Sequence, residues 1–149
     1  MIAGVAVVDA SVVVEFLVEL KYAAEASQIF REASRPDRDL DLWAPDLVYP
    51  ECASALRKLL RLKAISAPAG AAAVARLVRL PITAAGTASL MVDAWRIRDA
   101  VTPYDACYLA LAARLEAPFV TADERLARIH LRPAQPIHFL GDLGGGGDG

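Results

Sequence analysis

Four acidic residues of this chain follow short apolar runs or lie on a helix close to such a run; they are Asp9, Glu51, Asp105 and Asp123. Apolar runs that alternate with helical stretches predict a parallel sheet, and such sheets bind ligands at the carboxyl ends of their strands. Carboxylates delivered to one cleft repel one another, and a hard divalent cation with oxygen ligands relieves that repulsion. The four acids together therefore predict a metal site suited to phosphoryl chemistry.

Each acid also has a purely structural interpretation. Asp9 or Ser11 could cap the helix that starts there, and Glu51 could be an exposed helix residue. The segments 102–105 and 121–124 each fit a capping box, and the second would leave Asp123 as an acid in a first helical turn. Acids are common at helix starts, so each alternative is reasonable alone. The combination of all four acids in this context favours a site.

The elements that would position these acids alternate along the chain. Strands are expected at 5–8, 40–44, 81–83, 119–121 and 136–140, and helices at 12–17, 22–33, 45–62, 69–80, 87–98, 103–115 and 123–129. Pro50 makes the start of the third helix uncertain by several residues, because proline is disfavoured inside a helix. The pattern predicts one α/β domain over residues 1–140, and the glycine-rich residues 141–149 are expected to be a disordered tail.

Composition narrows the function further. Hydrophobic residues make up 56% of the 149 residues, which is enough for a compact core. No apolar run reaches the length of a membrane span and no signal peptide is recognisable, so we expect a cytoplasmic protein with no membrane partner. Cys52 and Cys107 have no CxxC spacing and no histidine nearby, which favours buried apolar roles over zinc or redox chemistry.

Positive charge is clustered although the net charge is −2. Arg57, Lys58 and Arg61 follow Glu51 on the same expected helix. Glu51, Ser54, Ala55 and Lys58 share one face at helical spacing, and the small residues would leave room for a ligand. A solvated helix face is the alternative explanation. If Glu51 belongs to a metal site, the helix would carry its cations toward the phosphates of a substrate, and we expect Arg57, Lys58 and Arg61 to bind those phosphates.

Four motif blocks carry a family resemblance. The block that ends in Asp9 and Ser11, the helix with Glu51, the block Thr102-Pro103-Tyr104-Asp105-Ala106-Cys107-Tyr108 and the block 117–123 come in one order along the chain. In that order the chain resembles PIN-domain ribonucleases, and most of all the VapC toxins of type II toxin–antitoxin systems. The resemblance spans about residues 2–140 and implies a three-layer α/β fold whose central parallel sheet is flanked by helices.

The resemblance also implies functional roles. Asp9, Glu51, Asp105 and Asp123 would be the catalytic quartet that holds Mg²⁺ or Mn²⁺, with Ser11 and Thr121 in supporting positions. The protein would be a metal-dependent endoribonuclease, a homodimer, and the toxin partner of a small VapB-like antitoxin. We expect Asp9 and Asp105 to ligate the main ion. Glu51 would complete its shell or orient the attacking water, while Asp123 would bind a second ion or act through water.

Rival classes fit less well. A phosphatase of the HAD type needs a second Asp where this chain has Ser11, and a response-regulator receiver needs a late lysine, whereas Lys63 is the last lysine. The serious alternative is a catalytically silent PIN-like module that binds RNA or a protein. The four intact acids disfavour it, because a binding module has little reason to keep them all.

Overall fold

The computed structural model describes residues 2–129 and 136–144 and contains one five-stranded parallel sheet in the order β3-β2-β1-β4-β5. The strands are β1 (Gly4–Val8), β2 (Leu40–Pro45), β3 (Ile82–Ala85), β4 (Phe119–Thr121) and β5 (Ile137–Phe139). The α-helices are α1 (Ala10–Val18), α2 (Ala23–Ala33), α3 (Val48–Arg61), α4 (Ala67–Leu77), α5 (Met91–Arg96), α6 (Pro103–Arg114) and α7 (Glu124–Ala127). The predicted α/β class is therefore confirmed.

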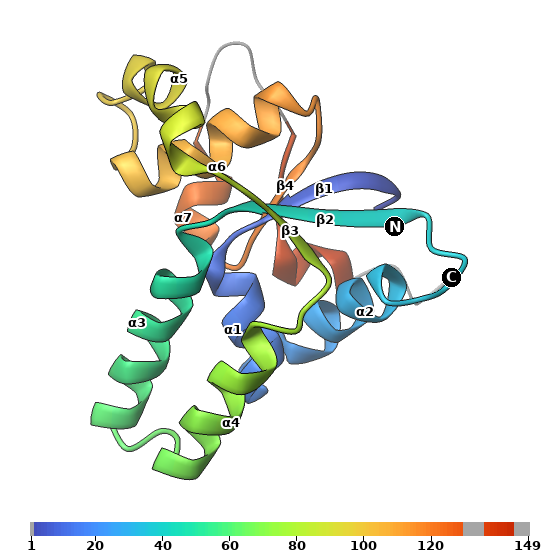
Figure 1. Cartoon of the computed structure of the whole chain (residues 1–149), viewed down its shortest axis with the longest axis vertical. Helices are drawn as coiled ribbons and strands as arrows, with labels where there is room; N and C mark the ends of the chain where they lie inside the picture. Colours follow the sequence, from blue (N-terminus) through green and yellow to red (C-terminus); the bar gives the residue numbers. More distant parts are fainter. Residues whose placement is uncertain (1, 130–135, 145–149) are drawn as a thin grey trace.

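Helices cover both faces of the sheet (Figure 1). On one side α1 contacts α2, α3 and α4, and α2 contacts β2; on the other side α6 packs on β1 and β2 and carries α5. The hairpin of α3 and α4 extends away from the sheet (Figure 1). β2 and β3, the next strands in the chain, lie on one side of β1 in the sheet, whereas β4 and β5 lie on the other side. The order of strands thus reverses between β1 and β4, which is the position where open α/β sheets form a ligand crevice.

The central strand is buried because it is covered on both faces. Ala6, Val7 and Val8 of β1 are each at most 1% exposed, as expected for a strand in a parallel sheet with helices on both sides. Val7 pairs with Trp43 of β2 and with Phe119 of β4. This double pairing fixes the direction in which the chain leaves β1. The residue that follows, Asp9, therefore enters the crevice in a defined position.

Several helix starts follow from local sequence. Ser66 caps α4 and Thr102 caps α6, each through a side-chain oxygen that accepts a backbone N–H, and proline lies in the first turn of both helices. The expected start of α3 at residue 45 is wrong. β2 continues through Pro45, and the Asp46 carboxylate accepts the N–H of Thr87 instead of capping α3. The helix begins at Val48, which leaves Pro50 in its first turn.

Two further boundaries differ from expectation. The helix expected over 87–98 begins as a 3₁₀ turn, η1 (Thr87–Leu90), before it continues as α5, a common start for an α-helix. The chain also stays ordered beyond residue 141, because η2 (Leu140–Gly144) contacts α2 and Leu140 is fully buried. A Cβ on Gly141 would lie 2.6 Å from the Phe139 ring, so a glycine is needed at this close approach. Residues 145–149 of the expected tail lie outside the described residues.

No helix in the described part of the chain is long and apolar enough to cross a membrane.

Candidate active site

Asp9 lies at the end of β1 and is held by hydrogen bonds on both carboxylate oxygens. Its Oδ1 accepts the Ser11 hydroxyl at 2.5 Å and the Val12 N–H at 3.2 Å. Its Oδ2 accepts the Thr121 hydroxyl at 2.6 Å. The residue is 6% exposed, and burial raises the pKa of its carboxyl to about 6, above the ordinary value of 3.8. Asp9 thus caps α1, as the structural interpretation expected, and is also a buried acid in the crevice.

Thr121 connects Asp9 to Asp123 across two strands. The Thr121 hydroxyl donates to Asp9 and accepts the N–H of Asp123 at 3.0 Å, and Ser11 accepts the N–H of Ala122 at 2.8 Å. The expected capping box over 121–124 is wrong: Asp123 itself is the N-cap of α7 and accepts the N–H groups of the next turn. The Thr121 hydroxyl is free to hold Asp9 because Asp123 performs the capping.

Glu51 reaches the same region from α3 and is held by a tyrosine. The hydroxyl of Tyr108 donates to Glu51 Oε1 at 2.8 Å. Tyr108 is 1% exposed, and burial raises the pKa of its phenol far above the ordinary value, so the hydroxyl remains a donor. The sequence analysis placed Tyr108 in the Asp105 motif block without a role of its own and missed this contact. The available signal was its position three residues after Asp105 on α6, together with the need of a buried tyrosine hydroxyl for a partner.

The carboxylates interact electrostatically across the crevice. Burial raises the pKa of Asp105, and the negative charge of Asp123 raises it further. Asp105 in turn contributes to the raised pKa values of Asp9 and Glu51, for which burial is again the largest cause. The structure therefore brings all four acids into one region of mutual repulsion. The pKa values of Asp9, Glu51 and Asp105 are raised mainly by burial, and repulsion from a neighbouring carboxylate adds to each shift.

The chemistry of this region suits a hard cation, although its side chains do not form a ready-made coordination shell. Among residues 2–129 and 136–144, no three His, Cys, Asp or Glu side chains are arranged as a metal-binding group. The donors that converge here are carboxylate and hydroxyl oxygens, which Mg²⁺ and Mn²⁺ prefer. Burial raises the pKa of the nearby Cys52 to about 12, so its thiol stays protonated. Both cysteines are buried and free, as predicted.

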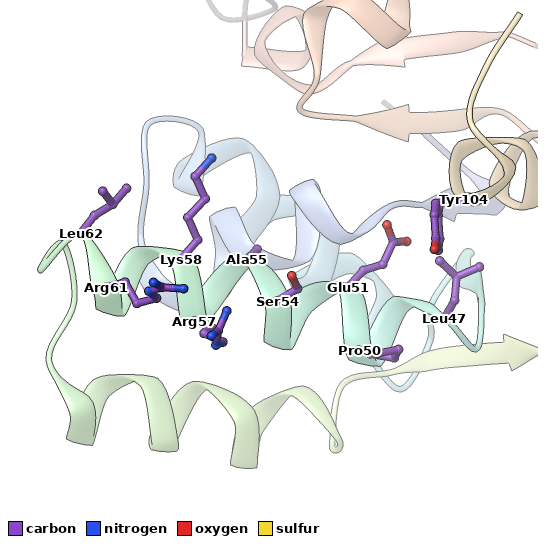
Figure 2. Close-up of a pocket in the computed structure, with 10 residues that line it drawn as sticks. All are labelled: Leu47, Pro50, Glu51, Ser54, Ala55, Arg57, Lys58, Arg61, Leu62 and Tyr104. Carbon is purple, nitrogen blue, oxygen red and sulfur yellow. The ribbon is translucent and has the colours of Figure 1, made fainter.

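A groove of about 860 Å³ runs along α3 from Glu51 (Figure 2). Glu51, Ser54, Ala55 and Lys58 all line it, which confirms that they share one helix face. Arg57 and Arg61 also line the groove, and both are exposed. Glu51 lies at one end of this groove and the cations lie further along the same helix. Asp105 lines a separate hollow together with Arg125.

Sequence comparison identifies the family. The PIN domain family matches residues 6–130 of this chain. The chain therefore belongs to the PIN-domain family, and within it to the VapC group, which its curated relatives define. Ribonuclease VapC3 of Mycobacterium tuberculosis is 34% identical over 124 residues, which cover 82% of this chain and 85% of VapC3. Ribonuclease VapC9 of the same species is 40% identical over 86 residues, 58% of this chain and 68% of VapC9.

Solved structures support the same fold. VapC20 of Mycobacterium tuberculosis, described as a toxin that cleaves the sarcin–ricin loop, superposes with a TM-score of 0.60 at 17% identity, covering 88% of this chain and 99% of VapC20. PAE2754 from Pyrobaculum aerophilum superposes with a TM-score of 0.63 at 20% identity, covering 95% and 94% of the two chains. At these identities the likeness establishes the arrangement of helices and strands.

Proposed function

We propose that this protein is a metal-dependent endoribonuclease that acts as the toxin of a VapBC-type toxin–antitoxin system. The observation that supports the proposal is the electrostatic coupling of Asp105 to Asp9, Glu51 and Asp123. Repulsion between these carboxylates would be relieved by a bound cation. The VapC relatives bear the name ribonuclease, and the four acids supply the groups that hydrolysis of a phosphodiester requires.

A bound Mg²⁺ or Mn²⁺ would supply Lewis acidity, lower the pKa of a water molecule and neutralise charge at the phosphate. In our proposal Asp9 and Asp105 hold the main ion. Glu51 completes its shell or orients the attacking water, and Asp123 binds a second ion or acts through water. Ser11 and Thr121 fix the rotamer of Asp9 through the hydrogen bonds described above, so that the carboxylate is presented in one orientation.

We further propose that Arg57, Lys58 and Arg61 bind the RNA backbone along the groove on α3. Lys58 follows Glu51 by two helical turns, so its backbone position lies about 10 Å further along the helix axis. Phosphate contacts of this kind position a strand without reading its sequence. As partners we propose a second copy of the chain in a homodimer and a small VapB-like antitoxin, and as location the cytoplasm.

The first test is cleavage of RNA by antitoxin-free protein. With Mg²⁺ or Mn²⁺ we expect cleavage, and EDTA should stop it. Asp105→Asn should reduce kcat/KM by at least about 100-fold, because it removes a charged ligand whose loss costs roughly 3 kcal/mol or more in the transition state. Asp41→Asn changes an exposed acid paired with Arg38 and serves as the control. Metal binding without any cleavage would favour the silent binding module.

The second test addresses the cations. Lys58→Glu should weaken RNA binding and reduce the slope of log affinity against log salt by about one to two, because fewer counterions are released. Affinity for Mn²⁺ should stay unchanged. Lys21→Glu, which lies outside the groove, provides a matched charge reversal. Equal affinity and equal salt slopes for both variants would show that the cluster is only a solvated helix face.

A further inference from the structure

An aromatic ring stands exposed at the acid end of the groove. Tyr104 lies in the first turn of α6, directly before Asp105, and is 63% exposed. It lines the groove together with Leu47, Pro50 and Glu51 of the facing segment. Figure 2 shows Tyr104 beside Glu51 and Leu47 at one end, with Lys58, Arg61 and Leu62 at the other. The ring is therefore next to the proposed cleavage centre and accessible from the groove.

The exposure of Tyr104 contrasts with the burial of the next tyrosine of the same helix. Tyr108 is 1% exposed and donates a hydrogen bond to Glu51, so packing and polar chemistry both account for it. Tyr104 has neither role: within residues 2–129 and 136–144 its hydroxyl makes no hydrogen bond, and most of its surface faces solvent. A large aromatic surface left in water beside a catalytic centre is available to a ligand.

The rest of the groove indicates the chemistry of that ligand. Arg57, Lys58 and Arg61 give the far end positive charge, and Ser54 and Ala55 keep the middle open. Positive charge that follows a backbone, combined with an aromatic face for a base, is the pattern by which proteins bind single-stranded nucleic acid. A base within a duplex has both faces covered by its neighbours, so only an unpaired base could use the ring.

We propose that Tyr104 is a base-stacking subsite: its ring stacks on an unpaired base beside the phosphate to be cleaved and restricts the site to single-stranded RNA or loops. This inference rests on the proposed ribonuclease function and deepens it by assigning a residue that positions a substrate base. The cations hold the backbone along α3, and the ring turns the adjoining base toward α6. The phosphate between them then lies beside Glu51, the acid that lines the groove.

Binding of a fluorescent single-stranded oligoribonucleotide in EDTA tests the proposal, because the RNA is then not cut. Tyr104→Ala should weaken binding roughly 5- to 150-fold, the range for loss of one stacked base, without changing the salt slope. Tyr104→Phe and Tyr104→Trp should bind within about twofold of the wild type, since each keeps an aromatic face. A fully paired duplex of the same sequence should bind all variants equally.

Trp95→Ala is the matched control. Trp95 is 62% exposed on α5, lies outside the groove and has the Arg98 guanidinium over its ring. Its loss should leave affinity unchanged, and circular dichroism should show both alanine variants folded, because neither ring is part of the core.

Three results would overturn the stacking subsite. Unchanged affinity of Tyr104→Ala would do so, and RNA cleavage by the same variant with Mn²⁺ would show that the ribonuclease function itself stands. An equal loss in Tyr104→Phe would assign the effect to the hydroxyl. Conversion of a dimer to a monomer by Tyr104→Ala in gel filtration would assign the ring to a contact between copies. Absence of cleavage by the wild type would instead refute the underlying function.

Discussion

The two halves of the acid site are built in different ways. Asp9 and Asp123 lie at the ends of β1 and β4, and Thr121 bonds to both of them within the sheet. Glu51 and Asp105 come from α3 and α6, where they are half-buried, and one hydrogen bond from Tyr108 holds Glu51. Strand pairing positions the first half, whereas helix packing positions the second.

The two halves also differ in how much free energy the burial of their carboxylates costs. Asp9, the most buried of the four acids, is also the one with the most hydrogen bonds, yet burial still outweighs those bonds in its pKa. Glu51 and Asp105 keep contact with water, which screens their charges. Substitutions in the strand half should therefore change stability and metal binding together, and those in the helix half should act mainly on metal binding.

The largest expected effect is at Asp9. Its pKa of about 6 in the folded protein exceeds the ordinary value of 3.8, so folding favours the protonated form. The resulting stabilisation is fully present below about pH 4 and is lost as pH rises through about 6, an effect on the order of 3 kcal/mol. Asp105 and Glu51 shift in the same direction. Asp9→Asn should remove most of this pH dependence and raise the melting temperature at pH 7 in EDTA.

Thermal melts in EDTA from pH 4 to 8 measure this effect, with Asp41→Asn as the exposed control. Added Mn²⁺ at ~100 times its dissociation constant should stabilise the wild type by roughly 2.7 kcal/mol and should fail to stabilise Asp9→Asn. The same signs are expected for Asp105→Asn, with a smaller rise in EDTA. If Asp9→Asn melts below the wild type at pH 7 and Mn²⁺ shifts neither protein, Asp9 is only a helix cap.

Thr121→Val should have the next largest effect. Valine keeps the shape but leaves Asp9 Oδ2 and the Asp123 N–H without the hydroxyl that joins them. A buried polar group without a partner costs about 1–3 kcal/mol, and loss of a supporting contact lowers metal affinity about 10- to 100-fold. Calorimetry of Mn²⁺ binding and thermal melts measure the two effects. Thr83→Val, exposed on β3, is the control, and equal behaviour of both variants would argue that Thr121 has no positioning role.

Tyr108→Phe should have the smallest effect of the three. The variant removes the donor to Glu51 without removing the ring from the core, so the loss of stability should be about 1 kcal/mol. Glu51 is half-exposed and water replaces the hydroxyl, which should limit the loss of Mn²⁺ affinity to about 10-fold. Tyr104→Phe is the matched control because its hydroxyl has no described partner. A loss of stability larger than that of Thr121→Val would reverse the ranking of the two halves.

Much of this arrangement could be predicted because its signals are local. Alternating apolar runs and helical periods predicted five parallel strands, and β4 has the expected bounds of 119–121. The strand half of the site could also be predicted from the sequence, since Asp9 directly follows β1 and Thr121 ends β4. The carboxyl ends of adjacent parallel strands must lie together once the sheet forms.

The remaining features depend on contacts between distant segments. The start of α3 could not be predicted because Asp46 bonds to the N–H of Thr87, a residue 41 positions away. Likewise, the contact of Tyr108 with Glu51 exists only because α3 and α6 meet, and local periodicity describes Tyr108 simply as apolar. The order beyond residue 141 arises from packing on α2, which a glycine-rich composition does not reveal.

The hydrogen bond between Asp9 and Thr121 spans 112 positions of the chain, and this span has a consequence for protein synthesis. At ~5–20 residues per second, roughly 5–20 s separate the translation of these two residues. During that interval β1 lacks the neighbour that completes the crevice, and Asp105 and Asp123 have not emerged. A nascent chain that has not yet reached Thr121 therefore carries no assembled acid cluster.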